Sequence, residues 1–158
     1  MAGTDLRAFA YPLEAVRRQR QWLLDAALAR LSALRRQVDE RVTERSRLYR
    51  ECVAQAQLAA RVWANYPNPA AQTGLLGYLA ALQQRQIDAE RALANLADQV
   101  KQAQQACALQ QQKLEVLDQH RSEELKAFAN QQHRKSGVQA DHDWVARESH
   151  RKSGSQVP

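Results

Sequence analysis

Glycine, proline and aromatic residues are scarce in this chain. Its 158 residues include five glycines and four prolines, and aromatic side chains make up 6% of them. Residues 13–65 contain no glycine or proline, and residues 70–132 contain only Gly74 and Gly77. Because glycine and proline mark turns and loops, their scarcity argues against a fold built from many short elements. The low aromatic content and a mean hydropathy of −0.65 also exclude a wide globular core.

Motifs for catalysis, phosphate binding and metal binding are missing as well. The sequence has no glycine-rich phosphate loop, no nucleophile elbow and no pair of carboxylates placed for acid–base catalysis. None of the four histidines stands at a spacing typical of zinc ligands, and His142 between Asp141 and Asp143 is a pattern common on protein surfaces. We therefore expect a protein that is not an enzyme and that binds no metal and no cofactor.

Long apolar stretches are absent too. No segment has the length and hydrophobicity of a membrane-spanning helix. Residues 1–5 lack the basic and apolar regions of a signal peptide. The sequence therefore predicts a cytoplasmic protein without membrane insertion.

Two long runs of apolar residues at alternating three- and four-residue steps dominate what the chain does contain. One covers residues 12–65 and the other residues 69–132, and each predicts an amphipathic helix. In the short break at residues 65–69, Pro67 and Pro69 disfavour helical geometry at the residues before them, and Asn68 before Pro69 is typical of a helix start. A connection this short makes the helices antiparallel neighbours. The predicted fold class is all-α: two long helices in an antiparallel coiled-coil hairpin with a flexible C-terminal tail.

A turn near Pro67 also predicts how the two helices pair, because residues whose numbers add up to about 134 then face each other. Cys107 lies opposite Ala27 in this pairing, and Cys52 lies opposite Leu82. At about 1.5 Å per residue, the two sulfurs are about 37 Å apart along the hairpin, which is too far for a disulfide. Two free thiols predict a reducing compartment.

The seam, meaning the positions through which the two helices pack, can be predicted from the same repeat. On the first helix it begins with Leu24, Ala27, Leu31, Leu34 and Val38. Continuing this repeat would bury Arg41 and Arg45, so we expect it to shift by one residue, as a stutter does. The shifted seam consists of Val42, Ser46, Tyr49, Val53, Ala56, Ala60 and Trp63, with Leu48 and Cys52 at its flanks. The seam of the second helix consists of Leu75, Leu79, Leu82, Gln86, Ala89, Leu93, Leu96, Val100, Ala103, Cys107, Gln110, Leu114, Leu117, Arg121, Glu124 and Phe128.

The hairpin occupies residues 12–132, between a lead-in of residues 1–11 and a tail of residues 133–158. The second helix is the longer one, and we expect its overhang, with Leu125 and Phe128, to pack on the apolar lead-in residues or on another protein. The tail is polar and basic and contains the sequence His-Arg-Lys-Ser-Gly twice, so we expect it to be mobile. Trp144 in the tail is either a docking anchor or an incidental residue.

Positive charge is concentrated on the first helix. The net charge is +6 with a pI near 9.7, and residues 12–65 contain eleven arginines against six acids. These arginines form either a solvated face with ion pairs within the helix, such as Glu40 with Arg36 and Glu44 with Arg47, or a binding face for carboxylates or phosphates. Acids interrupt the arginines and no aromatic platform accompanies them, which argues against nucleic-acid binding.

A basic hairpin of this length resembles a known family. With its short proline-containing turn, its return helix rich in glutamine and arginine and its basic tail, the chain is similar to the central stalk proteins of type III secretion systems (the YscO group) and their flagellar counterpart FliJ. Residues 141–147 (DHDWVAR) resemble the plant-pathogen branch of this group. The resemblance implies a non-enzymatic virulence-associated coupling protein. Such a stalk sits in the pore of a hexameric secretion ATPase, promotes its activity and connects it to the export gate and to secretion chaperones.

The resemblance also suggests which residues contact partners. The basic end that carries both termini would meet the ATPase, and the end with the turn would meet the export gate. The predicted partner-binding residues are Arg17, Arg18, Arg20, Arg35, Arg36, Trp63, Tyr66, Asn68, Arg121, Phe128 and Trp144. The alternative to a secretion stalk is a basic coiled-coil scaffold or a nucleic-acid-binding module.

Overall fold

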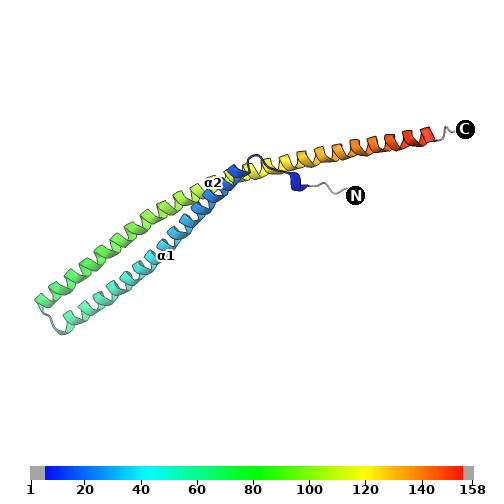
Figure 1. The fold of residues 1–158 in the computed structure, drawn as a ribbon. Coiled ribbons are helices and arrows are strands. Elements are labelled where there is room, and N and C mark those ends of the chain that lie inside the picture. The colour runs from blue at the N-terminus through cyan, green and yellow to red at the C-terminus, as the bar shows by residue number, and fades with distance from the viewer. Residues whose placement is uncertain (1–5, 155–158) are drawn as a thin grey trace. The chain divides into compact units, whose positions relative to one another are not determined.

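The computed structural model describes residues 6–154, and all regular structure in this range is helical. A short 3-10 helix, η1 (Leu6–Ala8), precedes two long α-helices, α1 (Glu14–Asn65) and α2 (Pro69–Gly154). The chain reverses direction between α1 and α2, so the two helices pack in antiparallel orientation (Figure 1). The predicted all-α hairpin is therefore confirmed. The outer parts of the predicted lead-in and tail, residues 1–5 and 155–158, lie outside the described residues.

The helix ends agree with the prediction at the turn and differ from it elsewhere. α1 ends at Asn65 and α2 begins at Pro69, as predicted, whereas α1 begins at Glu14 rather than at Pro12. The predicted end of the second helix near Gln132 is wrong, because α2 continues to Gly154. Residues 133–153 contain no proline and a single glycine, so nothing stops a helix that has already begun. That the tail is mobile in solution stays a prediction.

The turn consists of Tyr66, Pro67 and Asn68, and Asn68 caps α2. The Ala70 amide donates to Oδ1 of Asn68 at 3.0 Å, and the Gln72 amide donates to the Asn68 carbonyl at 3.0 Å as the first hydrogen bond of the helix. This confirms the helix start predicted from the Asn-Pro pair.

The chain forms two compact units, to which both α-helices contribute. The first, here called the terminal unit, consists of Met1–Trp22 and Gln111–Pro158, and the second, here called the tip unit, is Leu23–Gln110 and includes the turn. Each unit has its own contacts between α1 and α2, and the two are described in turn.

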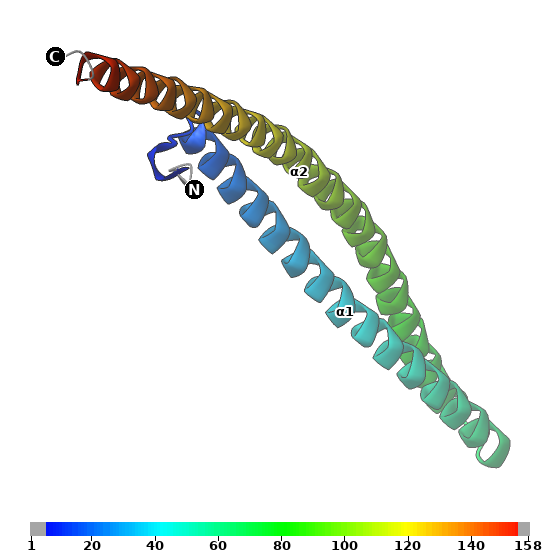
Figure 2. The ribbon, with the colours of Figure 1, turned by 90° about the vertical axis from the view of Figure 1, so that its right-hand side faces the viewer.

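In the tip unit, α1 and α2 lie side by side on both sides of the turn (Figures 1 and 2). The core consists of Leu31, Leu34, Leu96, Ala103 and Cys107, with Ala27, Val38 and Val100 packed against it. Its members match the predicted pairing, because the numbers of Leu31 and Ala103, and of Ala27 and Cys107, add up to 134. Cys107 is buried, Cys52 is half-buried, and both are free thiols.

The predicted shift of the α1 seam is wrong. Leu48 and Ala59 are buried at 4% and 5% exposure, whereas Tyr49 and Trp63 are 58% and 49% exposed. The first repeat therefore continues without a stutter. The observed seam of α1 beyond Leu34 consists of Val38, Arg41, Arg45, Leu48, Cys52, Gln55, Ala59 and Val62.

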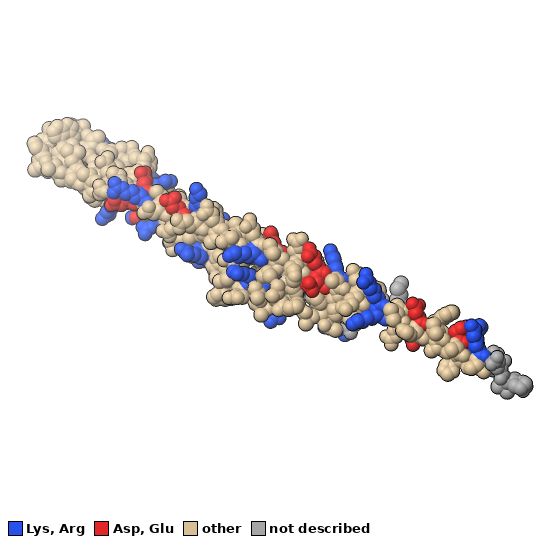
Figure 3. All heavy atoms as spheres, turned by 90° about the horizontal axis from the view of Figure 1, so that it is seen from above, with Lys and Arg blue, Asp and Glu red and all other residues tan. Residues whose placement is uncertain are grey.

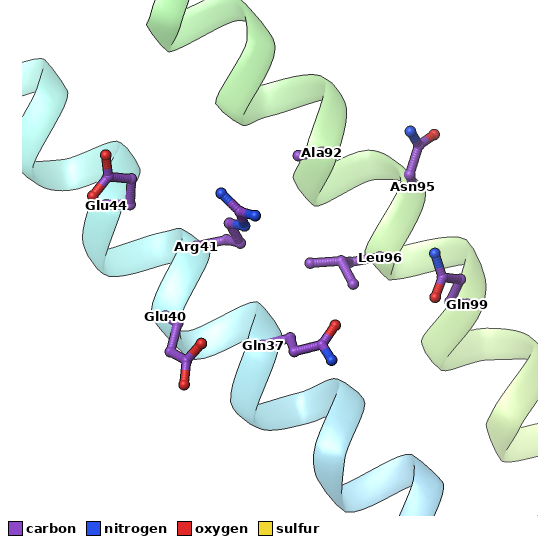
Figure 4. A pocket seen from close by; sticks show the side chains of 8 residues that line it. All are labelled: Gln37, Glu40, Arg41, Glu44, Ala92, Asn95, Leu96 and Gln99. Atoms are coloured by element: carbon purple, nitrogen blue, oxygen red, sulfur yellow. The ribbon is translucent and has the colours of Figure 1, made fainter.

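Two arginines are tolerated in this seam because they are not buried. Arg41 and Arg45 are both exposed, and Arg41 extends beside Ala92 in a hollow between the helices (Figure 4). An arginine can cover apolar surface with its aliphatic stem while its guanidinium group stays in water. The small side chain of Ala92 leaves room for this arrangement.

The seam predicted for the second helix is confirmed from Leu75 to Leu117, since every residue in it is buried or half-buried. Leu82 is the most deeply buried side chain of the described residues, with 1% exposure. The last polar positions of the predicted seam, Arg121 and Glu124, are exposed. Packing between α1 and α2 therefore ends at the level where α1 begins.

In the terminal unit, the lead-in covers the overhang of α2. Tyr11 is buried, and its hydroxyl lies 2.8 Å from Nδ1 of His120 and 3.3 Å from the carbonyl oxygen of Leu117. The Phe9 ring packs on Phe128 with 5.6 Å between the ring centroids, a favourable distance for an aromatic pair. The predicted contact between the lead-in and the α2 overhang is thus confirmed.

Candidate interaction surfaces

Glu14, at the first position of α1, lies close to three arginines of the terminal unit that were predicted to bind a partner. Its carboxylate accepts two hydrogen bonds from Arg17 at 3.1 Å and one from Arg18 at 3.4 Å, and it lies 3.8 Å from Arg121 of α2. Arg17 also donates to Asp118 at 3.2 Å. Three guanidinium groups thus share the carboxylates of Glu14 and Asp118.

The ion pairs in this cluster shift the pKa values of its members. The hydrogen bond from Arg17 is the main reason why the pKa of Glu14 lies below its ordinary value, and the same bond raises the pKa of Arg17. Burial raises the pKa of Tyr11, and the nearby carboxylates of Glu124, Glu14 and Asp118 add to the effect. Each of these shifts moves the pKa further from neutral pH, so the Glu14 carboxylate and the Arg17 guanidinium stay charged and the Tyr11 hydroxyl stays protonated.

The other predicted residues of the terminal unit differ in accessibility. Arg20 is half-buried, whereas the Arg18 side chain is 78% exposed despite its contact with Glu14. Phe128 is occupied by its contact with Phe9. Trp144 lies on α2 with 67% exposure, so it is accessible to a partner.

In the tip unit, the predicted residues fall into two groups. Arg35 and Arg36 are exposed on α1. Trp63 and Tyr66 are exposed near the turn, and the Asn68 side chain is used as the cap of α2. Arg36 and Trp63 are about 40 Å apart along α1 at about 1.5 Å per residue, so one small partner cannot contact both groups.

The end of the tip unit that contains the turn is almost free of charge. Arg61 is the only charged side chain in residues 53–84, and hardly any blue or red appears at the left-hand end of Figure 3. The middle of α1 is different, because Glu44 forms an ion pair with Arg47 at 3.0 Å. The expected pair of Glu40 with Arg36 does not form within residues 6–154. Arg47 thus pairs with a carboxylate of its own helix, whereas Arg36 does not pair with Glu40 and can contact a partner.

Sequence reasoning missed an exposed apolar surface on α1. The residues of the shifted seam (Val42, Ser46, Tyr49, Val53, Ala56, Ala60 and Trp63) are all exposed, and we call them the α1 stripe. The signal was present in the sequence as a second heptad repeat, one residue out of step with the observed seam. The pattern alone did not show which repeat faces α2.

The described residues contain neither a candidate metal site nor a candidate membrane span. No three His, Cys, Asp or Glu side chains within residues 6–154 are grouped so as to hold a metal ion. Neither helix in this range has a segment long and apolar enough to cross a membrane. Comparison with known proteins also returned nothing, since no family model, curated protein or solved structure matches the chain.

Proposed function

We propose that the protein is a non-enzymatic coupling protein, the central stalk of a type III secretion or flagellar export system in the cytoplasm. In this role it binds the hexameric secretion ATPase, promotes its activity and links it to the export gate and to secretion chaperones. The observation that carries the proposal is the long antiparallel hairpin with chemically different surfaces. An arginine cluster lies where α1 begins, and an almost uncharged segment lies at the turn.

The arginine cluster supports contact with an acidic partner. Arg18 and its neighbours are exposed or half-exposed at the start of α1, and guanidinium groups pair well with carboxylates. The uncharged segment supports contact with a less polar partner, for which Trp63 and Tyr66 offer exposed aromatic surface.

The proposal predicts that the protein stimulates ATP hydrolysis by the cognate secretion ATPase. Changing Arg17, Arg18 and Arg20 together to Glu should raise the concentration needed for half-maximal stimulation by about tenfold or more, because attraction to an acidic surface of the ATPase becomes repulsion at three positions. The measurement is a titration of the ATPase with each variant in a hydrolysis assay.

Reversing Arg45, Arg50 and Arg61 to Glu provides the matched control, since it changes the net charge equally on the tip unit. This variant should stimulate nearly as well as the wild type. Absence of stimulation by the wild-type protein would exclude the secretion-stalk proposal. Tight DNA binding that weakens steeply with salt would favour the alternative, a nucleic-acid-binding module.

A further inference from the structure

The α1 stripe has the pattern of a helix-packing seam but faces no other part of the tip unit. Its residues follow one another in steps of four and three, as in a heptad repeat. Four of them are large apolar side chains with high exposure: Val42 at 38%, Tyr49 at 58%, Val53 at 40% and Trp63 at 49%. Ser46 is the only polar member, and no charged residue interrupts the stripe.

α2 extends this apolar surface on the same face of the hairpin. Leu76 and Ile87, which are 55% and 44% exposed, lie eleven residues apart, about three helical turns, and so share one face of α2. A surface hollow lined by Ser46 and Tyr49 of the stripe, by Arg45 and Arg50 beside it, and by Gln86 and Glu90 of α2 shows that this face adjoins the α1 stripe and that charged side chains border it. The opposite face is polar, with Tyr78 of α2 hydrogen-bonded to Glu51 of α1 at 2.6 Å.

We propose that a second copy of the chain covers this face, so that two tip units pack face to face as an antiparallel four-helix bundle. The inference does not depend on the proposed function.

Side-chain size supports an antiparallel pairing of the α1 stripe with the α1 stripe of the second copy. When Val53 faces Ala56 of the second copy, Tyr49 faces Ala60 and Trp63 faces Ser46, so that three of the four large side chains meet a small one, while Val42 lies opposite Pro67 of the turn. Leu31 and Ala103, which face each other within the hairpin, are an example of a layer in which a large side chain meets a small one. Moving the pairing by one heptad in one direction places Trp63 opposite Asp39, whose carboxylate would lose water without gaining a partner, whereas moving it in the other direction places Trp63 opposite Val53, so that two large side chains meet. One register is therefore favoured over both its neighbours.

Charge is compatible with this register as well. Arg50, which flanks the stripe, comes close to Gln57 and Ala64 of the second copy, so no two like charges meet there. Charged side chains lie on both faces of the tip unit: Glu44, Arg47, Arg85 and Asp88 on the polar face, and Arg45, Arg50 and Glu90 beside the α1 stripe. The faces differ in the stripe itself, whose heptad positions from Val42 to Trp63 contain no charged residue.

The size of the face is sufficient for a stable dimer. At about 1.5 Å per residue the stripe is about 32 Å long, and two packed helices are about 20 Å wide. The patch therefore measures roughly 600 Å² per copy, or roughly 1,200 Å² in total, which reaches the lower end of the range for stable protein interfaces.

The test is the mass of the full-length protein in solution, measured by sedimentation velocity over a concentration series. The wild type should reach twice its chain mass of 17.9 kDa. Val53→Lys places two positive charges in the centre of the interface and should halve the mass. Because Val53 is 40% exposed in the single hairpin, the helix content measured by circular dichroism should not change.

Leu58→Lys is the matched control. Leu58 is 45% exposed on α1, five residues from Val53 and outside the stripe, so this variant should remain dimeric. A wild type that stays at 17.9 kDa up to the highest concentration overturns the proposal. It is equally overturned by a dimer that survives Val53→Lys, or by one that Leu58→Lys disrupts to the same extent.

A cysteine cross-link tests the register independently. In a background with Cys52→Ala and Cys107→Ala, a mixture of the Val53→Cys and Ala56→Cys chains should form a covalent dimer under mild oxidation, because these positions face each other. A mixture of Val53→Cys and Leu58→Cys chains should not. Equal cross-linking in both mixtures would contradict the proposed packing.

Discussion

Replacing Leu82 by alanine is expected to lower the free energy of unfolding by about 3 kcal/mol. Leu82 is 1% exposed and lies in the α2 seam opposite Cys52. A two-helix seam has little other apolar material at this level, so the cavity left by the missing side chain cannot be refilled from a second layer. The effect should be the largest of any single leucine truncation in the tip unit.

The measurement is thermal or urea unfolding monitored by circular dichroism, in a Val53→Lys background so that self-association does not contribute. At roughly 2–4 °C per kcal/mol for a chain of this size, the midpoint should fall by about 6–12 °C. Leu109→Ala makes the same chemical change on the same helix at a side chain that is 50% exposed, and it should cost less than about 1 kcal/mol. Equal losses from both variants would show that Leu82 is not a seam residue.

The second large effect distinguishes the two possible registers of α1. Leu48→Ala should destabilise the protein by about 2–3 kcal/mol, because Leu48 is 4% exposed in the seam. Tyr49→Ala should cost less than about 1 kcal/mol, because Tyr49 is 58% exposed in a single hairpin. The shifted register predicts the opposite order.

Both register variants are again compared in the Val53→Lys background, with the concentration of urea at the midpoint as the readout. In chains that can still self-associate, Tyr49→Ala should additionally weaken the dimer, while Leu48→Ala should act on the unfolding of each hairpin. If Tyr49→Ala lowered the urea midpoint more than Leu48→Ala in the monomeric background, the shifted register of α1 would be correct.

Local sequence signals were sufficient to predict the hairpin. Asn68 and Pro69 start α2 by a mechanism that depends on two neighbouring residues, and the hydrogen bond from the Ala70 amide to Asn68 confirms it. The pairing of Leu31 with Ala103 then follows from counting residues away from the turn. Both predictions succeeded because they require no knowledge of distant contacts.

The register of α1 and the end of α2 could not be predicted in the same way. Two apolar repeats run side by side on α1, and the wrong one was preferred because it kept Arg41 and Arg45 out of the seam. The structure keeps both guanidinium groups in water without moving the repeat, which a rule about residue types does not anticipate. At the end of α2, a polar composition predicts a loop, but residues 133–153 contain no proline that would end the helix.

The candidate surfaces were predicted unevenly. The contact of Arg17 with the other helix follows from the antiparallel pairing, but the central role of Glu14 in holding Arg17, Arg18 and Arg121 does not. The sequence predicts Trp63 both as a seam residue and as a partner contact. Because Trp63 is 49% exposed, it is not a seam residue, and only the predicted partner contact stays possible. The chemistry of a protein partner is not contained in a periodic pattern, so the secretion ATPase remains a proposal.

The hairpin pairing is tested most directly by a distance between spin labels at Arg36 and Asp98, two exposed positions whose numbers add up to 134. The labels are placed in a background with Cys52→Ala and Cys107→Ala, and labelled protein is diluted with unlabelled protein to remove distances between chains. The hairpin predicts helix axes about 10 Å apart, extended only by the two labels. Labels at Arg36 and Trp63, both on α1, provide a reference distance of about 40 Å along that helix. A separation of about 90 Å between positions 36 and 98, as in one continuous helix, would contradict the account.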